Sequence, residues 1–319
     1  MAIQFHGSVR GIETAMNGKE TDSFPLYALI TAAKNEAPHI ELTMQSVIAQ
    51  ECKPICWVIV NDGSTDATEA IVSKYLREAK FIHLISNLPR DKRDFGAKAR
   101  ALKQALDYLT KNNAACKYLG TLDADISFKP DYYKCLIRRM ESESNYGITS
   151  GVCYESENGQ WVYDHPNPEW CCGGQAQVFR SHLYNEFGGY PELPLGGEDT
   201  VLEYLVREKG YNVRAFTDCI FHHHKKTSFS GNKGLRDYFL QGKQSYLWGS
   251  RFIYELIKSA ARARRKPYLL SGIWRLLGYV GGAIEYRKPS IPAQQVRIVR
   301  KQQLHRLLRL IFGIGNKRL

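Results

Sequence analysis

The sequence predicts an α/β fold in which helices flank a sheet, followed by a basic helical extension. Three observations support this prediction. Short apolar runs alternate along the chain with segments whose apolar residues recur at helical spacing. The runs are apolar throughout, which is typical of strands covered by helices on both faces. Polar residues follow several runs directly, at the sheet edge where ligands of such folds bind.

The elements follow one another in a regular order after residue 23. We expect residues 1–23 to be a flexible lead, because they show no strong periodicity. Apolar runs predict strands at 26–33, 55–60, 81–85, 118–122 and 147–152. Helical spacing predicts helices at 40–49, 67–77, 98–109 and 131–140, the last of them directly after Pro130.

The pattern weakens after residue 152 and then resumes. Residues 153–175 form an aromatic stretch that we expect to be irregular. A strand at 177–179, a short helix, a helix at 200–207 and strands at 213–216 and 219–221 follow it. We therefore place a sheet domain at 24–226 and a helical, basic region at 227–319.

Charge divides the chain in a similar way. The net charge is +12, yet residues 251–319 hold sixteen lysines and arginines against two glutamates, and residues 1–250 are close to neutral. Apolar residues and arginines share helical spacing at 268–286 and 296–314, so we expect helices that lie on an anionic membrane surface. Helices packed on the body with a solvated basic face remain an alternative. The region lacks zinc-finger spacing and RNA-binding sheet motifs, so we expect no nucleic-acid partner.

Composition excludes several other classes of protein. Hydrophobic residues make up 44% of the chain and charged residues 24%, which excludes wholesale disorder. No stretch reaches the roughly 18 apolar residues of a spanning helix, and the N-terminus lacks the regions of a secretory signal. We expect a cytoplasmic protein, peripheral on the inner face of the cell membrane. Its eight scattered cysteines are expected to be free thiols.

Carboxylates follow two of the predicted strands. Asp62 follows the second strand, and Asp123 and Asp125 follow the fourth, two residues apart. Oxygen ligands of this kind suit Mg²⁺ or Mn²⁺ chelated by a diphosphate, although such pairs also occur as solvated turn residues. The glycine-rich signatures of dinucleotide and P-loop sites are absent.

Two further groups lie later in the chain. Glu198 and Asp199 begin a predicted helix, where the helix dipole favours carboxylates and where one of them could also accept a proton. The run from His222 to His224 follows the last predicted strand. Such a run is often merely exposed, but one imidazole there could bind a divalent metal.

These motifs occur in an order that resembles the inverting glycosyltransferases of family 2, bacterial-type enzymes of polysaccharide or glycolipid assembly. The resemblance covers 24–226 and implies the GT-A fold, a Rossmann-like nucleotide-binding mixed sheet flanked by helices. The matching segments are Asn35-Glu36 with Ser46 and Gln50, Val60–Asp66, Gly96–Arg100, Leu122–Asp125, Gly173–Gln175 with Phe179-Arg180, Gly188–Tyr190, Gly197–Asp199 and His222.

The resemblance also implies roles for individual residues. Asp125 and His222 would hold Mn²⁺ or Mg²⁺, Asp199 would be the catalytic base, and Glu198 would position the acceptor. The substrates would be a UDP- or GDP-sugar and a lipid-linked or oligosaccharide acceptor at the membrane. The donor site would be lined by Ala32, Asn35, Glu36, Asp62, Arg100, Asp123, Gly174 and Gln175.

Two departures from the family pattern keep alternatives open. Asn61 replaces the first aspartate of the family's Asp-Asp-Gly motif, which supports a non-catalytic scaffold that binds nucleotide sugar or membrane. The QxxRW motif of processive synthases has only a faint counterpart in 241–248, so we do not expect a processive synthase. A nucleotidyltransferase would carry a glycine-rich basic loop near its first strand, and 34–36 is not one.

Overall fold

The structure is a computed structural model that describes residues 4–6, 24–89, 96–157, 159–163, 169–225, 234–264 and 267–312. The chain divides into two compact units. The first comprises Met1–Tyr190 and Tyr211–Lys226, and the second comprises Pro191–Gly210 and Thr227–Leu319. Residues 191–210 thus group with the C-terminal residues. The predicted boundary at residue 226 stays a prediction.

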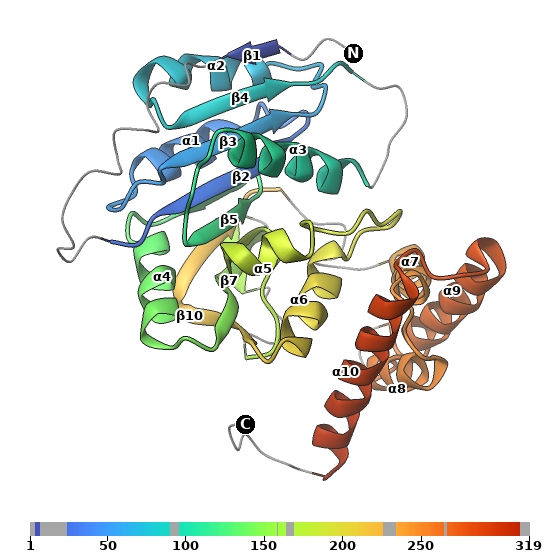
Figure 1. Ribbon diagram of the computed structural model, residues 1–319. Helices are drawn as coiled ribbons and strands as arrows, with labels where there is room; N and C mark the ends of the chain where they lie inside the picture. Colours follow the sequence, from blue (N-terminus) through green and yellow to red (C-terminus); the bar gives the residue numbers. More distant parts are fainter. Residues whose placement is uncertain are drawn as a thin grey trace. The chain divides into compact units, whose positions relative to one another are not determined.

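A mixed sheet runs through the first unit (Figure 1). Its order is β1-β4-β3-β2-β5-β9-β7-β10-β6, and β8 pairs with β7. Neighbours among β4, β3, β2 and β5 are parallel, whereas β9 is antiparallel to both β5 and β7. The strands are β1 Gln4–His6, β2 Tyr27–Ala33, β3 Cys56–Asn61, β4 Ile82–Ser86, β5 Tyr118–Leu122, β6 Ile126–Phe128, β7 Tyr146–Glu157, β8 Gln160–Tyr163, β9 Ala176–Arg180 and β10 Asn212–His223.

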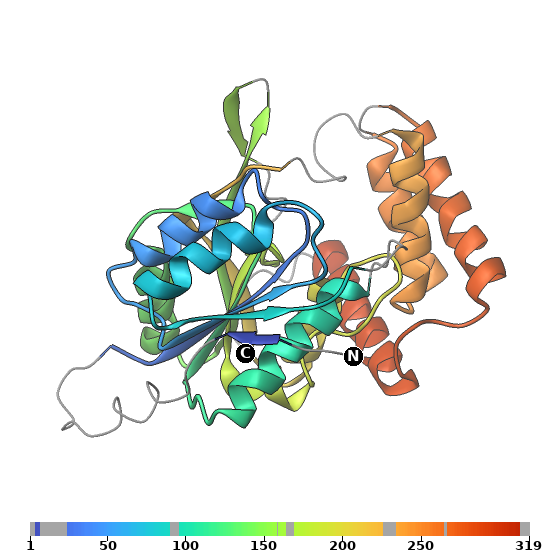
Figure 2. The ribbon, with the colours of Figure 1, turned by 90° about the horizontal axis from the view of Figure 1, so that it is seen from above.

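Helices cover both faces of this sheet. Figure 2 shows α1 and α2 on one face and α3 on the other. The strands between them are buried, with Leu29, Trp57 and Ile59 inaccessible to solvent. The helices of this unit are α1 Ile40–Ile48, α2 Thr68–Glu78, α3 Ala97–Lys111, α4 Tyr132–Ser142 and α5 Ser181–Glu186. The predicted α/β class with a mixed, helix-flanked sheet is confirmed.

Some local expectations were wrong. Residues 153–157 are not irregular, because β7 continues to Glu157 and forms a hairpin with β8. The two short strands expected at 213–216 and 219–221 are one strand, β10, with an irregularity in its pairing after Phe216. Short strands β1 and β6 were not predicted. The rest of the predicted lead and residues 313–319 lie outside the described residues.

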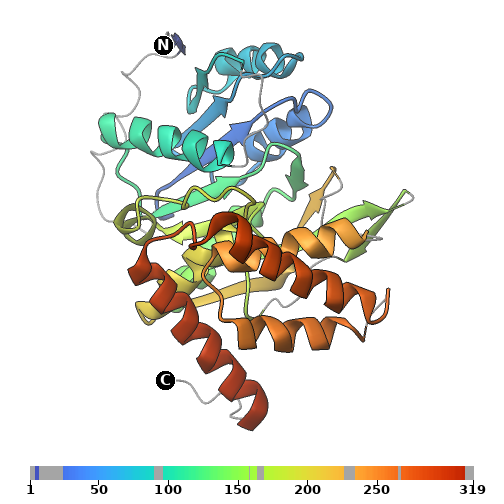
Figure 3. The same cartoon turned by 90° about the vertical axis from the view of Figure 1, so that its right-hand side faces the viewer.

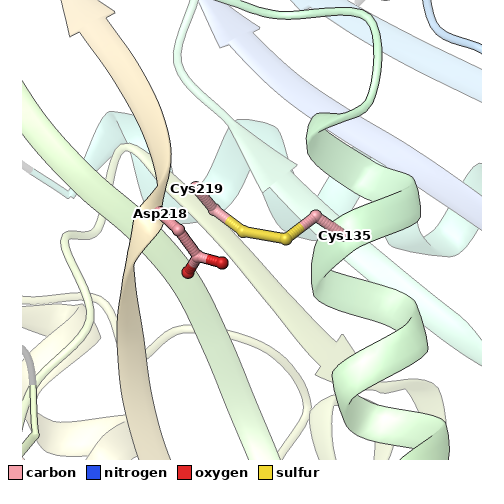
Figure 4. A group of neighbouring side chains, drawn as sticks. All are labelled: Cys135, Asp218 and Cys219. Carbon is pink, nitrogen blue, oxygen red and sulfur yellow. A yellow bond between two sulfur atoms is a disulfide. The ribbon is translucent and has the colours of Figure 1, made fainter.

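The expectation that every cysteine is a free thiol was also wrong. Cys135 on α4 and Cys219 on β10 form a disulfide, with Asp218 beside it (Figure 4). Packing of α4 against the sheet brings their Cα atoms to 6.8 Å, although 84 residues separate them in sequence. Sequence spacing alone could not reveal this pair, because the packing that joins them is long-range. None of the other six cysteines, all within the described residues, forms a disulfide.

The second unit is helical. Its helices are α6 Glu198–Glu208, α7 Leu235–Leu247, α8 Phe252–Arg262, α9 Leu270–Tyr286 and α10 Ala293–Phe312 (Figure 3). α9 packs against α7 and α8, and α10 packs along α6. Among the described helices, none has both the length and the apolar composition needed to cross a membrane. The predicted helical character of the C-terminal region is confirmed.

Candidate functional site

The carboxyl ends of three parallel strands form the first part of the candidate site. β2 lies between β3 and β5, so the segments that follow these strands meet at one edge of the sheet. Ala32 lies half-buried near the end of β2, paired with Val60. Asp62 and Asp123 follow β3 and β5 directly. This edge therefore brings together Ala32, Asp62 and Asp123, three of the predicted donor residues.

Asn35 holds the loop after β3 in place. Its backbone has a φ of 55°, in the left-handed region that asparagine tolerates better than most residues. Its amide oxygen accepts a hydrogen bond of 2.8 Å from the Thr65 backbone, and its own N–H donates to Ser64 Oγ at 2.9 Å. The Asn35 side chain thus binds the protein's own loop.

Glu36 faces a lysine from the last strand's end. Its carboxylate accepts a hydrogen bond of 2.7 Å from Lys225 Nζ, and its backbone N–H donates to Thr68 Oγ1 at 2.8 Å. Burial raises the pKa of Glu36, and the ammonium group of Lys225 offsets part of that rise. An ion pair therefore joins residues 36 and 225, which are far apart in sequence.

Asn61 is buried at the end of β3. Its amide nitrogen donates to Glu69 Oε2 at 2.8 Å, and its amide oxygen accepts from the Ser64 backbone at 3.1 Å. An aspartate could accept the second bond but could not donate the first. Asn61 therefore supports the loop that carries Asp62, a structural role that accounts for an amide at this position.

Asp62 is also buried, and its surroundings include α3. Asn87 donates to Asp62 Oδ1 at 3.3 Å and exchanges hydrogen bonds with Gln104 of α3. Arg100 lies half-buried in the first turn of the same helix. Asn87 thus links the Asp62 loop to Gln104 in the middle of α3.

Asp123 is joined to the turn before β9. Its backbone N–H donates to the carbonyl of Gln175 at 2.8 Å, and its carboxylate lies 2.6 Å from Lys98 Nζ. Gly174 belongs to the same turn. The predicted donor residues 123, 174 and 175 are therefore brought together.

Asp125 forms a buried chain with His223 and Glu155. The Nε2 atom of His223 lies 3.2 Å from Asp125 Oδ2, and its Nδ1 atom lies 3.0 Å from Glu155 Oε1. Burial disfavours charge on the imidazole, but the hydrogen bonds to Asp125 and Glu155 outweigh it and raise the pKa of His223 to about 10. The same contact lowers the pKa of Asp125 despite its burial.

The structure places His223, and not His222, beside Asp125. Side chains alternate along β10, so His223 points to the opposite face from His222. The ring of His222 packs instead on Trp161 of β8, with centroids 4.4 Å apart. His224 donates its backbone N–H to the Asp125 carbonyl, which fixes the end of β10 there.

The residues at Asp125 fit a divalent cation. Asp125 Oδ1 is buried and accepts no hydrogen bond from any of the described residues. A carboxylate oxygen beside an imidazole nitrogen is a donor set that suits Mn²⁺, and the carboxylate also suits Mg²⁺. Glu155 on the far nitrogen of His223 would hold the ring in the orientation that such a ligand needs.

Glu198 and Asp199 begin α6 in the second unit. Two glycines precede them, with φ of 79° at Gly196 and 90° at Gly197, a backbone conformation that favours glycine. The indole N–H of Trp248 donates to the Gly196 carbonyl at 3.2 Å, and a Cβ at Gly197 would lie 2.0 Å from the Trp248 ring.

Gln244 supports the same turn. Its amide nitrogen donates to the Leu195 carbonyl at 2.9 Å. Gln244 and Trp248 were not predicted as site residues, although both lie in 241–248, the segment with a faint likeness to the QxxRW motif. We name this contact set, Gln244 and Trp248 on the turn Leu195–Gly197, the turn support.

Comparison with known sequences identifies the relatives of this chain. The profile described as Glycosyl transferase family 2 matches residues 28–194. An uncharacterized glycosyltransferase of Haemophilus influenzae is 25% identical over 129 residues, which cover 39% of this chain and 35% of that protein. A poly-beta-1,6-N-acetyl-D-glucosamine synthase of Staphylococcus aureus is 27% identical over 145 residues, 44% of this chain and 32% of that protein. The matched regions thus span about a third of these relatives.

Solved structures share the fold. A mannosyltransferase from Pyrobaculum calidifontis, PcManGT, in complex with GDP-Man and Mn²⁺, superposes with a TM-score of 0.54 at 16% identity, covering 97% of this chain and 93% of that one. Residues 1–349 of S. aureus TarS in complex with UDP superpose with a TM-score of 0.50 at 15% identity, covering 68% and 63% of the two chains. Both comparisons concern the fold alone.

Proposed function

Because this chain belongs to glycosyl transferase family 2, we propose that it transfers a sugar from a nucleotide-sugar donor to an acceptor hydroxyl, with inversion at the anomeric carbon. The observation that carries this proposal is the acidic edge at the carboxyl ends of β2, β3 and β5, where Asp125 keeps a buried oxygen without a hydrogen bond. Such an edge suits a diphosphate bound through a divalent cation.

The donor in this proposal is a UDP- or GDP-sugar. The two superposed enzymes were solved with GDP-Man and with UDP, which supports this class of donor. The proposed pocket is formed by Ala32, Glu36, Asp62, Arg100, Asp123, Gly174 and Gln175, with Asn35 holding the loop that carries Asp62.

Asp125 and a histidine of β10 would hold Mn²⁺ or Mg²⁺. The family resemblance pointed to His222, but His223 is the histidine whose ring nitrogen faces Asp125, so we assign the second ligand to His223. A bound cation would neutralise the charge that develops on the leaving nucleoside diphosphate. Lys98 and Lys225, each paired with a carboxylate at this edge, would keep the site's negative charge from repelling the donor.

Asp199 would take the proton of the acceptor hydroxyl. As that oxygen attacks the anomeric carbon, the bond to the diphosphate oxygen breaks on the opposite side, which inverts the configuration. Glu198, its neighbour in the first turn of α6, would position the acceptor. The turn support would hold this end of α6 in one conformation.

The acceptor in this proposal is a lipid-linked glycan at the inner face of the cell membrane. The basic charge of residues 251–319 supports this part of the proposal, since anionic lipid headgroups attract such a segment.

A thermal-shift panel tests the donor site. Nucleoside diphosphates and nucleotide sugars are added to the full chain with and without Mn²⁺. We expect one nucleotide to raise the melting temperature only when the metal is present, and Asp125→Asn to lose that shift. Asp131→Asn, an exposed carboxylate at the start of α4, should keep it. No shift with any nucleotide would contradict the proposal.

A transfer assay tests the base. Asp199→Asn should keep the metal-dependent nucleotide shift and lose transfer by a factor of about 10² or more. Asp107→Asn, an exposed carboxylate on α3, is the matched control and should transfer normally. A fully active Asp199→Asn enzyme would refute the base assignment, and nucleotide binding without any transfer by the unmodified chain would favour a scaffold.

A further inference from the structure

The helices α8 and α9 present apolar side chains to solvent. On α8, Phe252, Ile253, Leu256 and Ile257 are between 39% and 55% exposed. On α9, the exposed apolar residues recur every three or four positions and are between 45% and 74% exposed. They are Leu270, Ile273, Leu277, Val280 and Ile284. We name these nine residues the apolar face.

Two charged residues of the same helices, Glu255 and Arg275, lie inside. Glu255 of α8 is completely buried, and its carboxylate lies 2.5 Å from Arg275 Nε of α9, which is itself largely buried. Ser259 and Ser271 are buried between the same helices. A helix pair in water normally buries its apolar stripe and exposes its charges. This pair buries an ion pair and exposes nine apolar side chains, which indicates that its outer surface is adapted to an apolar environment.

Close packing holds this arrangement. A Cβ at Gly278 of α9 would lie 1.9 Å from the carbonyl oxygen of Phe239 on α7, and a Cβ at Gly242 of α7 would lie 1.9 Å from that of Arg275. The backbones of α7 and α9 therefore meet where their glycines lie. Because that side of α9 is occupied by α7, the stripe of larger apolar residues is left on the outside.

Charge decides between possible occupants of the apolar face. Residues 251–319 carry a net charge of +14, and Arg251, Arg264, Arg287, Lys288 and Arg297 are exposed. Two copies of such a surface would repel each other, whereas anionic headgroups would be attracted by about 1 kcal/mol per basic residue. Arg251, Arg264, Arg287 and Lys288 flank α8 and α9 in sequence, and an apolar helix face with basic residues beside it is the pattern of helices that lie in a membrane interface.

The length of α9 indicates how it would lie. Its 17 residues extend about 26 Å, which is shorter than the roughly 30 Å hydrocarbon core of a bilayer. Its exposed apolar side chains, at three- and four-residue spacing, also lie on one side of the helix. Both properties favour a helix that lies parallel to the membrane plane over one that spans it.

We propose that the apolar face of α8 and α9 inserts into the boundary between headgroups and acyl chains of an anionic bilayer. The inference deepens the membrane-bound acceptor of the proposed function, on which it rests in part, by assigning the residues that make the contact. Basic residues around the face bind the headgroups, and the nine apolar side chains bind the acyl region.

Vesicle sedimentation with the full chain tests this proposal. The vesicles contain phosphatidylcholine either alone or mixed with phosphatidylglycerol. We expect binding to the mixed vesicles, and a loss of at least about tenfold in partitioning for the triple variant Ile273→Gln, Leu277→Gln, Ile284→Gln. The matched control is Leu26→Gln with Leu42→Gln, two residues of similar exposure in the first unit, and it should bind normally.

A charge variant separates the two contributions. Arg287→Glu with Lys288→Glu should weaken binding to the mixed vesicles and leave the protein's melting temperature unchanged, because both side chains are exposed. Unchanged vesicle binding by the triple variant would overturn the proposal. A second result would also overturn it: the unmodified chain does not bind vesicles and forms a dimer, and the triple variant is monomeric. The apolar face would then join two copies of the chain.

The nucleotide thermal shift distinguishes a failure of this inference from a failure of the proposed function. The metal-dependent thermal shift is measured on the same variants and should be unchanged. A chain that binds vesicles through the apolar face but shows no nucleotide shift would contradict the proposed function alone. A chain with the shift, whose triple variant still binds vesicles, would contradict this inference alone.

Discussion

His223 lies between two buried carboxylates, with one ring nitrogen facing each. Glu155 contacts Nδ1 and Asp125 lies near Nε2. A carboxylate on the far nitrogen of a metal-binding histidine normally fixes the orientation of the ring. In the metal-free protein the same two carboxylates favour the protonated imidazole, because each adds a charge-assisted hydrogen bond.

The pH dependence of stability should reveal this contact. The pKa of His223 rises from 6.5 to about 10 on folding, so its contribution to stability is complete below pH 6.5 and is lost as pH rises through about 10. We expect the difference in unfolding free energy between the metal-free protein and its His223→Gln variant to shrink between those pH values. Urea denaturation at several pH values measures it.

His222→Gln is the control for that measurement. Burial lowers the pKa of His222 from its ordinary value of 6.5, so above about pH 7 its imidazole is mostly neutral in both the folded and the unfolded chain. Its effect on stability should therefore not change between pH 7 and 10. A constant effect of His223→Gln over that range would argue against a protonated His223.

Asn61 offers a second test at the scale of one side chain. Asn61→Asp would place a carboxylate beside Glu69 Oε2, where the amide now donates a hydrogen bond. We expect a loss of about 1–3 kcal/mol in unfolding free energy at neutral pH. The loss should be smaller in acid, because the two carboxylates can then share a proton.

The double variant Asn61→Asp, Glu69→Gln serves as the control for this pair. A glutamine amide at residue 69 can donate to the new carboxylate, so most of the lost stability should return. A double variant no more stable than Asn61→Asp would mean that the contact with Glu69 is unimportant. Denaturant unfolding of the three proteins side by side decides the matter.

At the scale of elements, the end of α7 supports the start of α6. Both residues of the turn support donate hydrogen bonds to carbonyls of the turn before Glu198. The Trp248 ring also lies where a side chain at Gly197 would be. The end of one helix thus contacts the turn that leads into another.

Trp248→Phe should affect turnover more than donor binding. Phenylalanine lacks the indole N–H and fills less space, so the turn before Asp199 would lose its fixed position. We expect kcat to fall about tenfold or more with an unchanged metal-dependent nucleotide shift. Tyr246→Phe, on the same helix, keeps its ring packing against Tyr279 and should keep kcat. An equal fall in kcat for both variants would indicate a general loss of packing.

At the scale of the whole chain, one covalent bond joins distant segments of the first unit. The Cys135–Cys219 disulfide closes a loop of 84 residues between α4 and β10. β10 also carries His223, so the disulfide holds the strand that contacts Asp125.

Reduction should therefore lower stability measurably. We expect dithiothreitol to reduce the unfolding free energy by about 2–4 kcal/mol, because the unfolded chain gains freedom when the loop opens. Cys135→Ser without reductant should match the reduced protein. Thiol titration of the denatured, unreduced protein should find six thiols among the eight cysteines, and a count of eight would contradict the disulfide.

Much of the fold could be predicted because its signals are local. Continuous apolar runs marked β2, β3 and β5 to within about two residues, and 3.6-residue spacing marked α1, α2 and α3 similarly well. The strands β1 and β6 were not predicted, because a strand of three residues is too short to show an alternating pattern. Most predicted donor residues also lie together, because polar side chains after parallel strands must share one edge.

The sequence by itself determined the fold class, the family and the segments that carry acidic residues, since each depends on short-range patterns. Only the tertiary structure decided which histidine lies beside Asp125. Strand alternation places His222 and His223 on opposite faces of β10, but it does not determine which of those faces lies toward Asp125. The disulfide, the turn support and the Asn61–Glu69 contact also appear only in the folded chain. The buried ion pair between α8 and α9 also appears only in the folded chain, because helix packing, and not sequence periodicity, determines which side of each helix is buried.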